Sequence, residues 1–269
     1  MGKELAAKLT VALTKIEWPA EERPTDQGWE AYKVGLERVD SFRDDPQVLA
    51  AALRTFQAGG SRPYAFAGVA YTLIAASREA DGRFDENGLA EAMVWLEKAQ
   101  ATAPDITNIN FIEALIYLYN GRFDDTRLIL DYLHQQEPNN FYVCRVEADY
   151  WHALGEAAQA LQWLERSIAE ALTVPERMRL RRKMADWQFA DKQYEAALPI
   201  YKEVSRVDTE DHLIWHKISI CHWHLENYTE AGDANRRALA LKDFAAGRKM
   251  EEALKEKQDA GILGRLFGR

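Results

Sequence analysis

Apolar residues recur along most of the chain three and four positions apart, and strand-like alternation is nearly absent. This period predicts amphipathic helices, and turns that contain Pro, Gly or Asn divide the pattern into helical hairpins. The four most regular hairpins cover residues 107–138, 141–175, 178–209 and 212–243. Their turns are predicted near Asn120–Gly121, Gly155, Asp191–Lys192 and Glu226–Asn227.

The same kinds of residue return at a fixed spacing within these hairpins. Ala114 and Gly121 are followed 34 residues later by Ala148 and Gly155, and Ala197 is followed 34 residues later by Ala231. Between the two halves lies a three-residue insertion near residues 172–175. A period of this length indicates stacked helical hairpins. We therefore predict an all-α solenoid of stacked antiparallel helix pairs.

The pattern loosens towards the N-terminus. Helices near 64–78 and 87–102 form a further hairpin, residues 29–56 form a degenerate one, and residues 1–16 form a capping helix. The predicted organisation is N-terminal helices with a degenerate hairpin in 1–60, about five helix pairs in 61–243, a polar capping helix in 244–258 and an apolar, basic tail in 259–269. Solenoids need such caps because the last apolar face has no neighbour.

The repeated unit resembles the tetratricopeptide repeat, whose pattern is W-x2-L-G-x2-Y, then A-x3-F, then P. The match covers about two thirds of the chain and includes Trp215-x2-Ile218-Ser219-x2-His222, Ala231-x3-Asn235, Ala148-x2-Trp151, Ala160-x3-Leu164, Ala114-x2-Tyr117 and Pro138. The resemblance implies a right-handed superhelix with a concave groove that binds peptides or whole proteins. It also implies a non-catalytic adaptor or scaffold.

The first helix of each pair is expected to line this groove. Aromatic and Arg residues are the enriched anchors of protein interfaces. The candidate partner-binding residues on the expected inner face are Tyr142, Arg145, His152, Arg179, Arg182, Phe189, His216 and Trp223.

Residues 177–183 form the most basic run of the chain. Arg179 and Arg182 fall on the predicted inner face, where they would grip the carboxylates of an acidic partner segment. The alternative interpretation is a solvated helix face, with the cations paired to neighbours such as Glu176.

Four histidines, His212, His216, His222 and His224, lie close together around Cys221. His212 and His216 have the one-turn spacing of zinc ligands, but no His-Glu-x-x-His motif accompanies them. A metal-dependent enzyme built on these histidines is therefore kept only as an alternative. The sequence contains no recognisable nucleophile elbow, phosphate-binding Gly loop or dinucleotide fingerprint, so we expect no catalysis, metal or cofactor.

Net charge is −9, from 43 acidic and 34 basic residues. A basic excess drives affinity for nucleic acid and anionic membranes, so this balance disfavours both. Two cysteines, Cys144 and Cys221, are expected to be small buried hydrophobes. The N-terminus shows no secretory signal and no apolar run reaches the roughly 18 residues that span a bilayer, so we expect a soluble cytoplasmic protein.

The tail at 261–269 carries Ile262, Leu263, Leu266 and Phe267, which would form one apolar stripe on a helix. It is interpreted as a docking motif, a membrane-surface contact or an inert end. A membrane-proximal assembly factor anchored through this tail is thus an alternative function. Association between copies through exposed hairpin faces is also left open.

Overall fold

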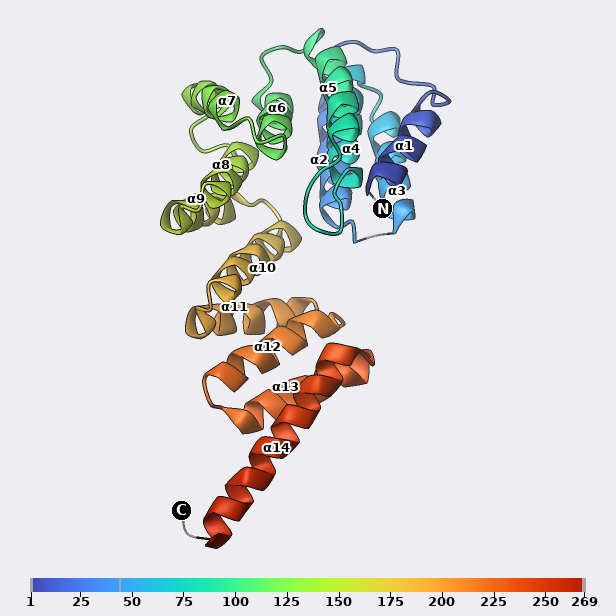
Figure 1. Ribbon diagram of the computed structural model, residues 1–269. Coiled ribbons are helices and arrows are strands. Elements are labelled where there is room, and N and C mark those ends of the chain that lie inside the picture. Colours follow the sequence, from blue (N-terminus) through green and yellow to red (C-terminus); the bar gives the residue numbers. More distant parts are fainter. Residues whose placement is uncertain (1, 44, 268–269) are drawn as a thin grey trace. The chain divides into compact units, whose positions relative to one another are not determined.

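A computed structural model describes residues 2–43 and 45–267, without the side chains from residue 258 onward. The described residues form fourteen helices, α1 to α14, and no strands (Figure 1). The predicted all-α solenoid of helix pairs is confirmed. The chain divides into two compact units, unit 1 (Met1–Glu170) and unit 2 (Ala171–Arg269).

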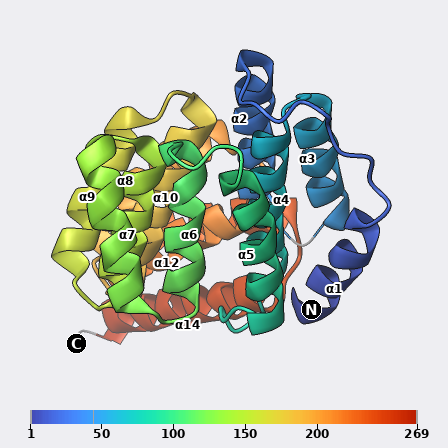
Figure 2. The same cartoon turned by 90° about the horizontal axis from the view of Figure 1, so that it is seen from above.

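Unit 1 contains four consecutive hairpins after an initial helix (Figure 2). Its helices are α1 (Gly2–Leu13), α2 (Asp26–Asp40), α3 (Pro46–Ala58), α4 (Arg62–Ala76), α5 (Glu86–Gln100), α6 (Thr107–Tyr119), α7 (Phe123–Gln136), α8 (Phe141–Ala153) and α9 (Ala157–Glu170). Unit 2 contains two hairpins and a final helix: α10 (Val174–Ala190), α11 (Tyr194–Val207), α12 (His212–His224), α13 (Tyr228–Leu241) and α14 (Ala245–Phe267).

The four regular hairpins share one turn. The residue at each turn has a positive φ, and these residues are Gly121 (72°), Gly155 (80°), Lys192 (62°) and Glu226 (61°). The residue that follows each of them donates its N–H to the carbonyl five positions upstream: Arg122 to Tyr117, Glu156 to Trp151, Gln193 to Gln188 and Asn227 to His222, at 2.8–2.9 Å. This is the Schellman ending of an α-helix, and it satisfies carbonyls that the helix leaves open.

The insertion near residue 174 lengthens a helix. α10 begins at Val174, not at 178 as the pattern predicts, because Thr173 and Glu176 form a capping box and Pro175 occupies the first turn. Thr173 accepts from the N–H of Glu176, whose side chain accepts from the N–H of Thr173. Pro is well suited to the first turn because the N–H groups there have no helical acceptor.

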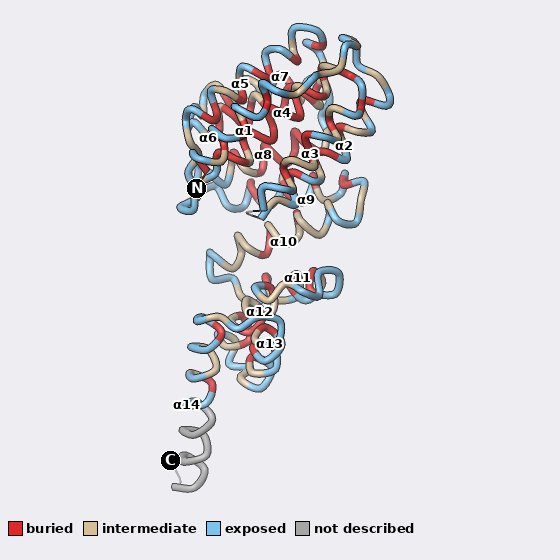
Figure 3. Tube along the Cα trace, turned by 90° about the vertical axis from the view of Figure 1, so that its right-hand side faces the viewer, coloured by how far each residue is buried: buried red, intermediate tan, exposed pale blue. Residues whose placement is uncertain are grey.

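In unit 1 the core is centred on α4, which packs against α1, α2, α3, α5 and α6. α4 is buried over most of its length, as are α6 and α8 (Figure 3). The predicted N-terminal capping helix is present as α1, and it packs on α4 and α5. Trp18 follows it and fits between Phe66 and Trp95, with ring centroids 5.8 and 5.3 Å away.

The core of unit 2 is smaller. It joins Tyr201 of α11 to Ile214, Ile218 and Cys221 of α12. Cys144 and Cys221 are both buried, as predicted, and burial raises the pKa of their thiols to about 11 and about 12.

α14 extends to Phe267, beyond the capping helix predicted for 244–258. The predicted apolar stripe of the tail lies outside the side chains that the structure describes. Within the described part of the chain, no helix has both the length and the apolar character needed to cross a membrane.

The shared turn predicts opposite effects on stability when Gly is introduced at one turn and removed from another. A non-Gly residue in the left-handed region costs roughly 1–2 kcal/mol, so Glu226→Gly should raise the free energy of unfolding by about 0.5–1 kcal/mol. Gly155→Ala should lower it by about 1 kcal/mol, because Ala resists the φ of 80° at that turn. Urea unfolding followed by circular dichroism measures both, and changes of the same sign would contradict the turn argument.

Candidate partner-binding surface

The inner helices of unit 1 are tied together by a buried arginine. Arg145 of α8 donates Nη1 to Oδ2 of Asp40 at the end of α2 (2.7 Å) and Nη2 to the hydroxyl of Tyr71 in α4 (2.6 Å). The Tyr71 hydroxyl donates to Oδ1 of Asp40, which closes a ring of charge-assisted hydrogen bonds. Burial lowers the pKa of Arg145, but the interactions with Asp40, Tyr71 and Tyr142 together outweigh it, and the pKa is raised well above its usual value.

Aromatic rings fill the space beside this ion pair. Phe111 of α6 stacks on Tyr142 of α8, with centroids 4.8 Å apart, and meets Tyr71 edge-on at 5.9 Å. Tyr32 of α2 is fully buried. Burial raises the pKa of Tyr32 and Tyr71 well above the usual value. The first helices of the four hairpins in unit 1 therefore cover one another with their own side chains.

This arrangement corrects the prediction that Tyr142 and Arg145 line an open groove. Both are buried, with 7% and 8% of their surface exposed, and Arg145 is paired with Asp40 of its own chain. A signal was present in the sequence. Asp40 stands at the C-terminal end of its helix, where the helix dipole disfavours a carboxylate unless a cation holds it there.

A buried carboxylate, that of Glu147, lies between α7 and α8. Glu147 accepts from Arg127 (2.5 Å), His134 (3.1 Å) and the indole of Trp151 (2.7 Å). Burial raises the pKa of Glu147, but the hydrogen bonds from His134 and Arg127 outweigh it and leave the pKa below its usual value. Sequence reasoning did not single out Glu147. His152, the remaining candidate on α8, is exposed near the end of that helix.

Unit 2 places Arg182 against its own chain as well. Arg182 Nη1 donates to Oδ2 of Asp211 at 2.6 Å and lies 3.9 Å from Asp208. Asp211 is also the N-cap of α12, since it accepts from the N–H of Leu213. Burial raises the pKa of Asp211, but Arg182 outweighs it and the pKa is lowered overall. Arg182 thus anchors the start of α12.

Other residues of the basic run also contact the protein's own chain or are partly buried. Arg181 pairs with Glu203 of α11 at 2.8 Å, and Arg179 is half-buried. Glu176 belongs to the capping box of α10. For Arg181 and Arg182 the structure therefore shows the alternative interpretation of this run, in which the cations pair with carboxylates of the same chain.

Three apolar side chains on the first helices of the hairpins in unit 2 are partly accessible. Phe189 of α10, with Ile220 and Trp223 of α12, are all half-exposed. Between the two helices Lys217 donates to Asp186 at 2.6 Å and lies 5.8 Å from the ring of Phe189. We call the surface formed by Phe189, Lys217, Ile220 and Trp223 the α10–α12 face.

The four histidines do not converge on one point. The rings of His212 and His216 both meet Phe244 edge-on, at 5.0 and 5.1 Å, while His224 stacks on Tyr194 at 4.1 Å. His222 is buried. Burial lowers the pKa of His216 and of His222. No group of three or more potential metal ligands occurs among the described residues.

Comparisons with known proteins identify structures with a similar fold. No protein-family model and no curated protein matches the chain. Among solved structures, PilF of Pseudomonas aeruginosa is similar with 14% identity and a TM-score of 0.54, over 68% of this chain and 86% of PilF. Yeast Tom70 has 12% identity and a TM-score of 0.55, over all of this chain and 62% of Tom70. Both are tetratricopeptide repeat proteins.

The fold is that of the tetratricopeptide repeat proteins. It confirms the fold that the repeat motifs imply. At these identities the similarity concerns the fold alone.

The buried ion pair of unit 1 makes a stability prediction. Arg145→Met should lower the free energy of unfolding by about 3–5 kcal/mol, because it leaves Asp40 without its cation. Adding Asp40→Leu to Arg145→Met should recover most of the loss, since apolar replacements of a buried pair are often tolerated. Chemical denaturation of the three proteins tests this, and a double variant no more stable than Arg145→Met alone would contradict it.

The pair in unit 2 predicts a dependence on pH. Arg182→Gln should destabilise the protein at pH 7 by roughly 1.5–3 kcal/mol. The pKa of Asp211 is lower in the folded protein than its value of about 3.9 in the unfolded chain, so its ion pair stabilises the protein most above that value. The difference in stability between wild type and Arg182→Gln should therefore shrink as the pH falls through the folded pKa of Asp211. Thermal unfolding between pH 3 and 7 measures it. Arg177→Gln, an exposed position on the same helix, is the control and should show no such trend.

Proposed function

We propose that the protein is a non-catalytic adaptor that binds a segment of a partner protein on the α10–α12 face. The observation that carries this proposal is that three apolar side chains, Phe189 of α10 and Ile220 and Trp223 of α12, are partly exposed on the helices where the repeat pattern predicts partner contact. Large aromatic and aliphatic side chains grouped in this way are typical anchors of protein interfaces.

The charges around this row favour a particular kind of segment. Lys217 is held by Asp186, and Arg182 by Asp211, so these cations already have carboxylate partners. A partner segment would gain little by supplying further carboxylates to them. We therefore expect a segment with apolar side chains rather than the acidic segment that the basic run suggests.

The test compares two double variants with the wild type in affinity capture from cells of the native host. Ile220→Asp with Trp223→Ala removes the two apolar anchors of α12 and should reduce the captured partner by more than tenfold, as expected when interface anchors of about 2 kcal/mol are lost. Circular dichroism should show unchanged helix content, because both positions are half-exposed.

The matched control is Leu128→Asp with Tyr132→Ala on α7. These side chains are 68% and 43% exposed and are one helical turn apart, so the control removes a similar amount of apolar surface elsewhere. The control should capture the partner as the wild type does. Equal capture by all three proteins would exclude the α10–α12 face as the binding surface.

A further inference from the structure

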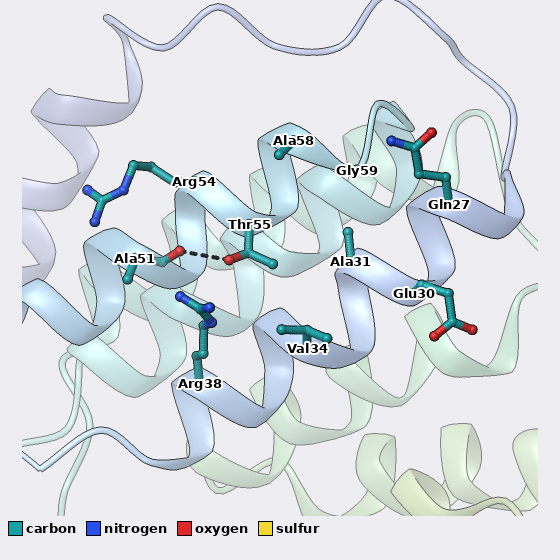
Figure 4. Close-up of a pocket in the computed structure, with 10 residues that line it drawn as sticks. All are labelled: Gln27, Glu30, Ala31, Val34, Arg38, Ala51, Arg54, Thr55, Ala58 and Gly59. Carbon is teal, nitrogen blue, oxygen red and sulfur yellow. Dashed lines mark hydrogen bonds between the residues drawn. The ribbon is translucent and has the colours of Figure 1, made fainter.

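Unit 1 carries a separate surface between its first two hairpin helices. An open groove of about 510 Å³ runs between α2 and α3, and we call it the α2–α3 groove (Figure 4). This volume lies within the roughly 300–1,000 Å³ of typical ligand pockets. Small apolar residues form much of its lining: Ala31 and Val34 from α2, and Ala51 and Ala58 from α3.

The groove lies on a hairpin whose helices α2 and α3 both pack against α4. Hairpins inside a solenoid are covered by neighbours on both sides, and terminal hairpins need a cap. The predicted cap, α1, packs on α4 and α5, and no residue of α1 lines the groove. Val34 is 44% exposed there, so apolar surface is left open to solvent at this hairpin.

The charges at the two ends of the groove differ. Arg38 of α2 and Arg54 of α3 lie at the same end, on either side of Ala51 (Figure 4). Both arginines are exposed, and in the described part of the chain neither has an ion pair. At the other end Glu30 is already paired with Lys33 at 2.8 Å. The groove therefore presents positive charge at one end only.

We propose that the α2–α3 groove binds an acidic amphipathic helix of a partner protein. A floor of Ala side chains lets the large apolar side chains of an incoming helix enter between α2 and α3, as in ridge-into-groove packing. Carboxylates at one end of that helix meet Arg38 and Arg54, whose guanidinium groups suit bidentate contact. This surface belongs to unit 1, so the proposal is independent of the α10–α12 face.

The probes are two synthetic, fluorescently labelled peptides with the same helical stripe of Leu residues. One carries Glu and the other Lys at the polar positions near one end. Fluorescence anisotropy should show the wild type binding the Glu peptide roughly tenfold more tightly than the Lys peptide. Arg38→Glu with Arg54→Glu should invert this preference, and Val34→Gln should weaken binding of the Glu peptide.

The control for total charge is Arg177→Glu with Arg206→Glu, two exposed positions of unit 2, and it should keep the preference of the wild type. Circular dichroism checks that each variant is folded. If Arg38→Glu with Arg54→Glu unfolds the protein, the single variants Arg38→Gln and Arg54→Gln replace it. Each should reduce the preference for the Glu peptide over the Lys peptide. Absence of saturable binding, or an unchanged preference after charge reversal, would overturn the proposal.

Light scattering tests whether a second copy of the chain, rather than a partner helix, covers the groove. Self-association of the wild type that Arg38→Glu with Arg54→Glu abolishes would show that a second copy of the chain covers the groove, and would overturn the proposal of a partner helix. The variants of the α10–α12 face should bind the Glu peptide normally. Failure of one proposal thus leaves the other unaffected.

Discussion

Burying the guanidinium of Arg145 constrains the inner side of unit 1, because a charge removed from water must keep its counter-ion or destabilise the fold. Asp40 and Tyr71 meet that requirement from α2 and α4. Tyr142 lies 5.6 Å from the guanidinium of Arg145 and stacks on Phe111, and both rings are buried with Tyr32. The side chains of these first helices that meet at Arg145 are thereby part of the core of unit 1.

Arg145 and Arg182 occupy matching positions of their repeats, 37 residues apart, once the three-residue insertion is counted. Each binds a carboxylate of its own chain, but the carboxylates come from different places. Asp40 precedes Arg145 by 105 residues, whereas Asp211 follows Arg182 by 29. One arginine joins the first helices of three hairpins, and the other anchors the start of α12, the first helix of the next hairpin. Residues at matching positions of two repeats can therefore have different structural roles.

The two surfaces proposed to bind partners differ in chemistry. On the α10–α12 face the charged side chains are paired and the apolar ones are half-exposed, so recognition there would depend on shape and burial of apolar area. In the α2–α3 groove the apolar floor is shallow and the arginines at one end are unpaired by the described residues, so charge would contribute more to specificity. Two surfaces of different chemistry would let one chain distinguish two partners.

The local pattern of the sequence was enough to predict the helices of the regular hairpins and their turns. It missed the start of α10, where a capping box and Pro175 extend the helix by a turn. It also assigned α1 the role of a cap without showing which helices it covers. The turn position was predictable even at Lys192 and Glu226, where no glycine marks it, because the 34-residue period together with the three-residue insertion aligns both residues with Gly121 and Gly155.

The sequence by itself determined the solenoid, since the period of apolar and small residues depends only on how neighbouring helices pack. Only the tertiary structure decided which arginines remain available to a partner. Whether a cation is buried or free depends on carboxylates that the chain brings back from distant positions, and no local pattern around Arg145 contains Asp40. For that reason the fold could be predicted from the sequence, and the pairing of its buried charges could not.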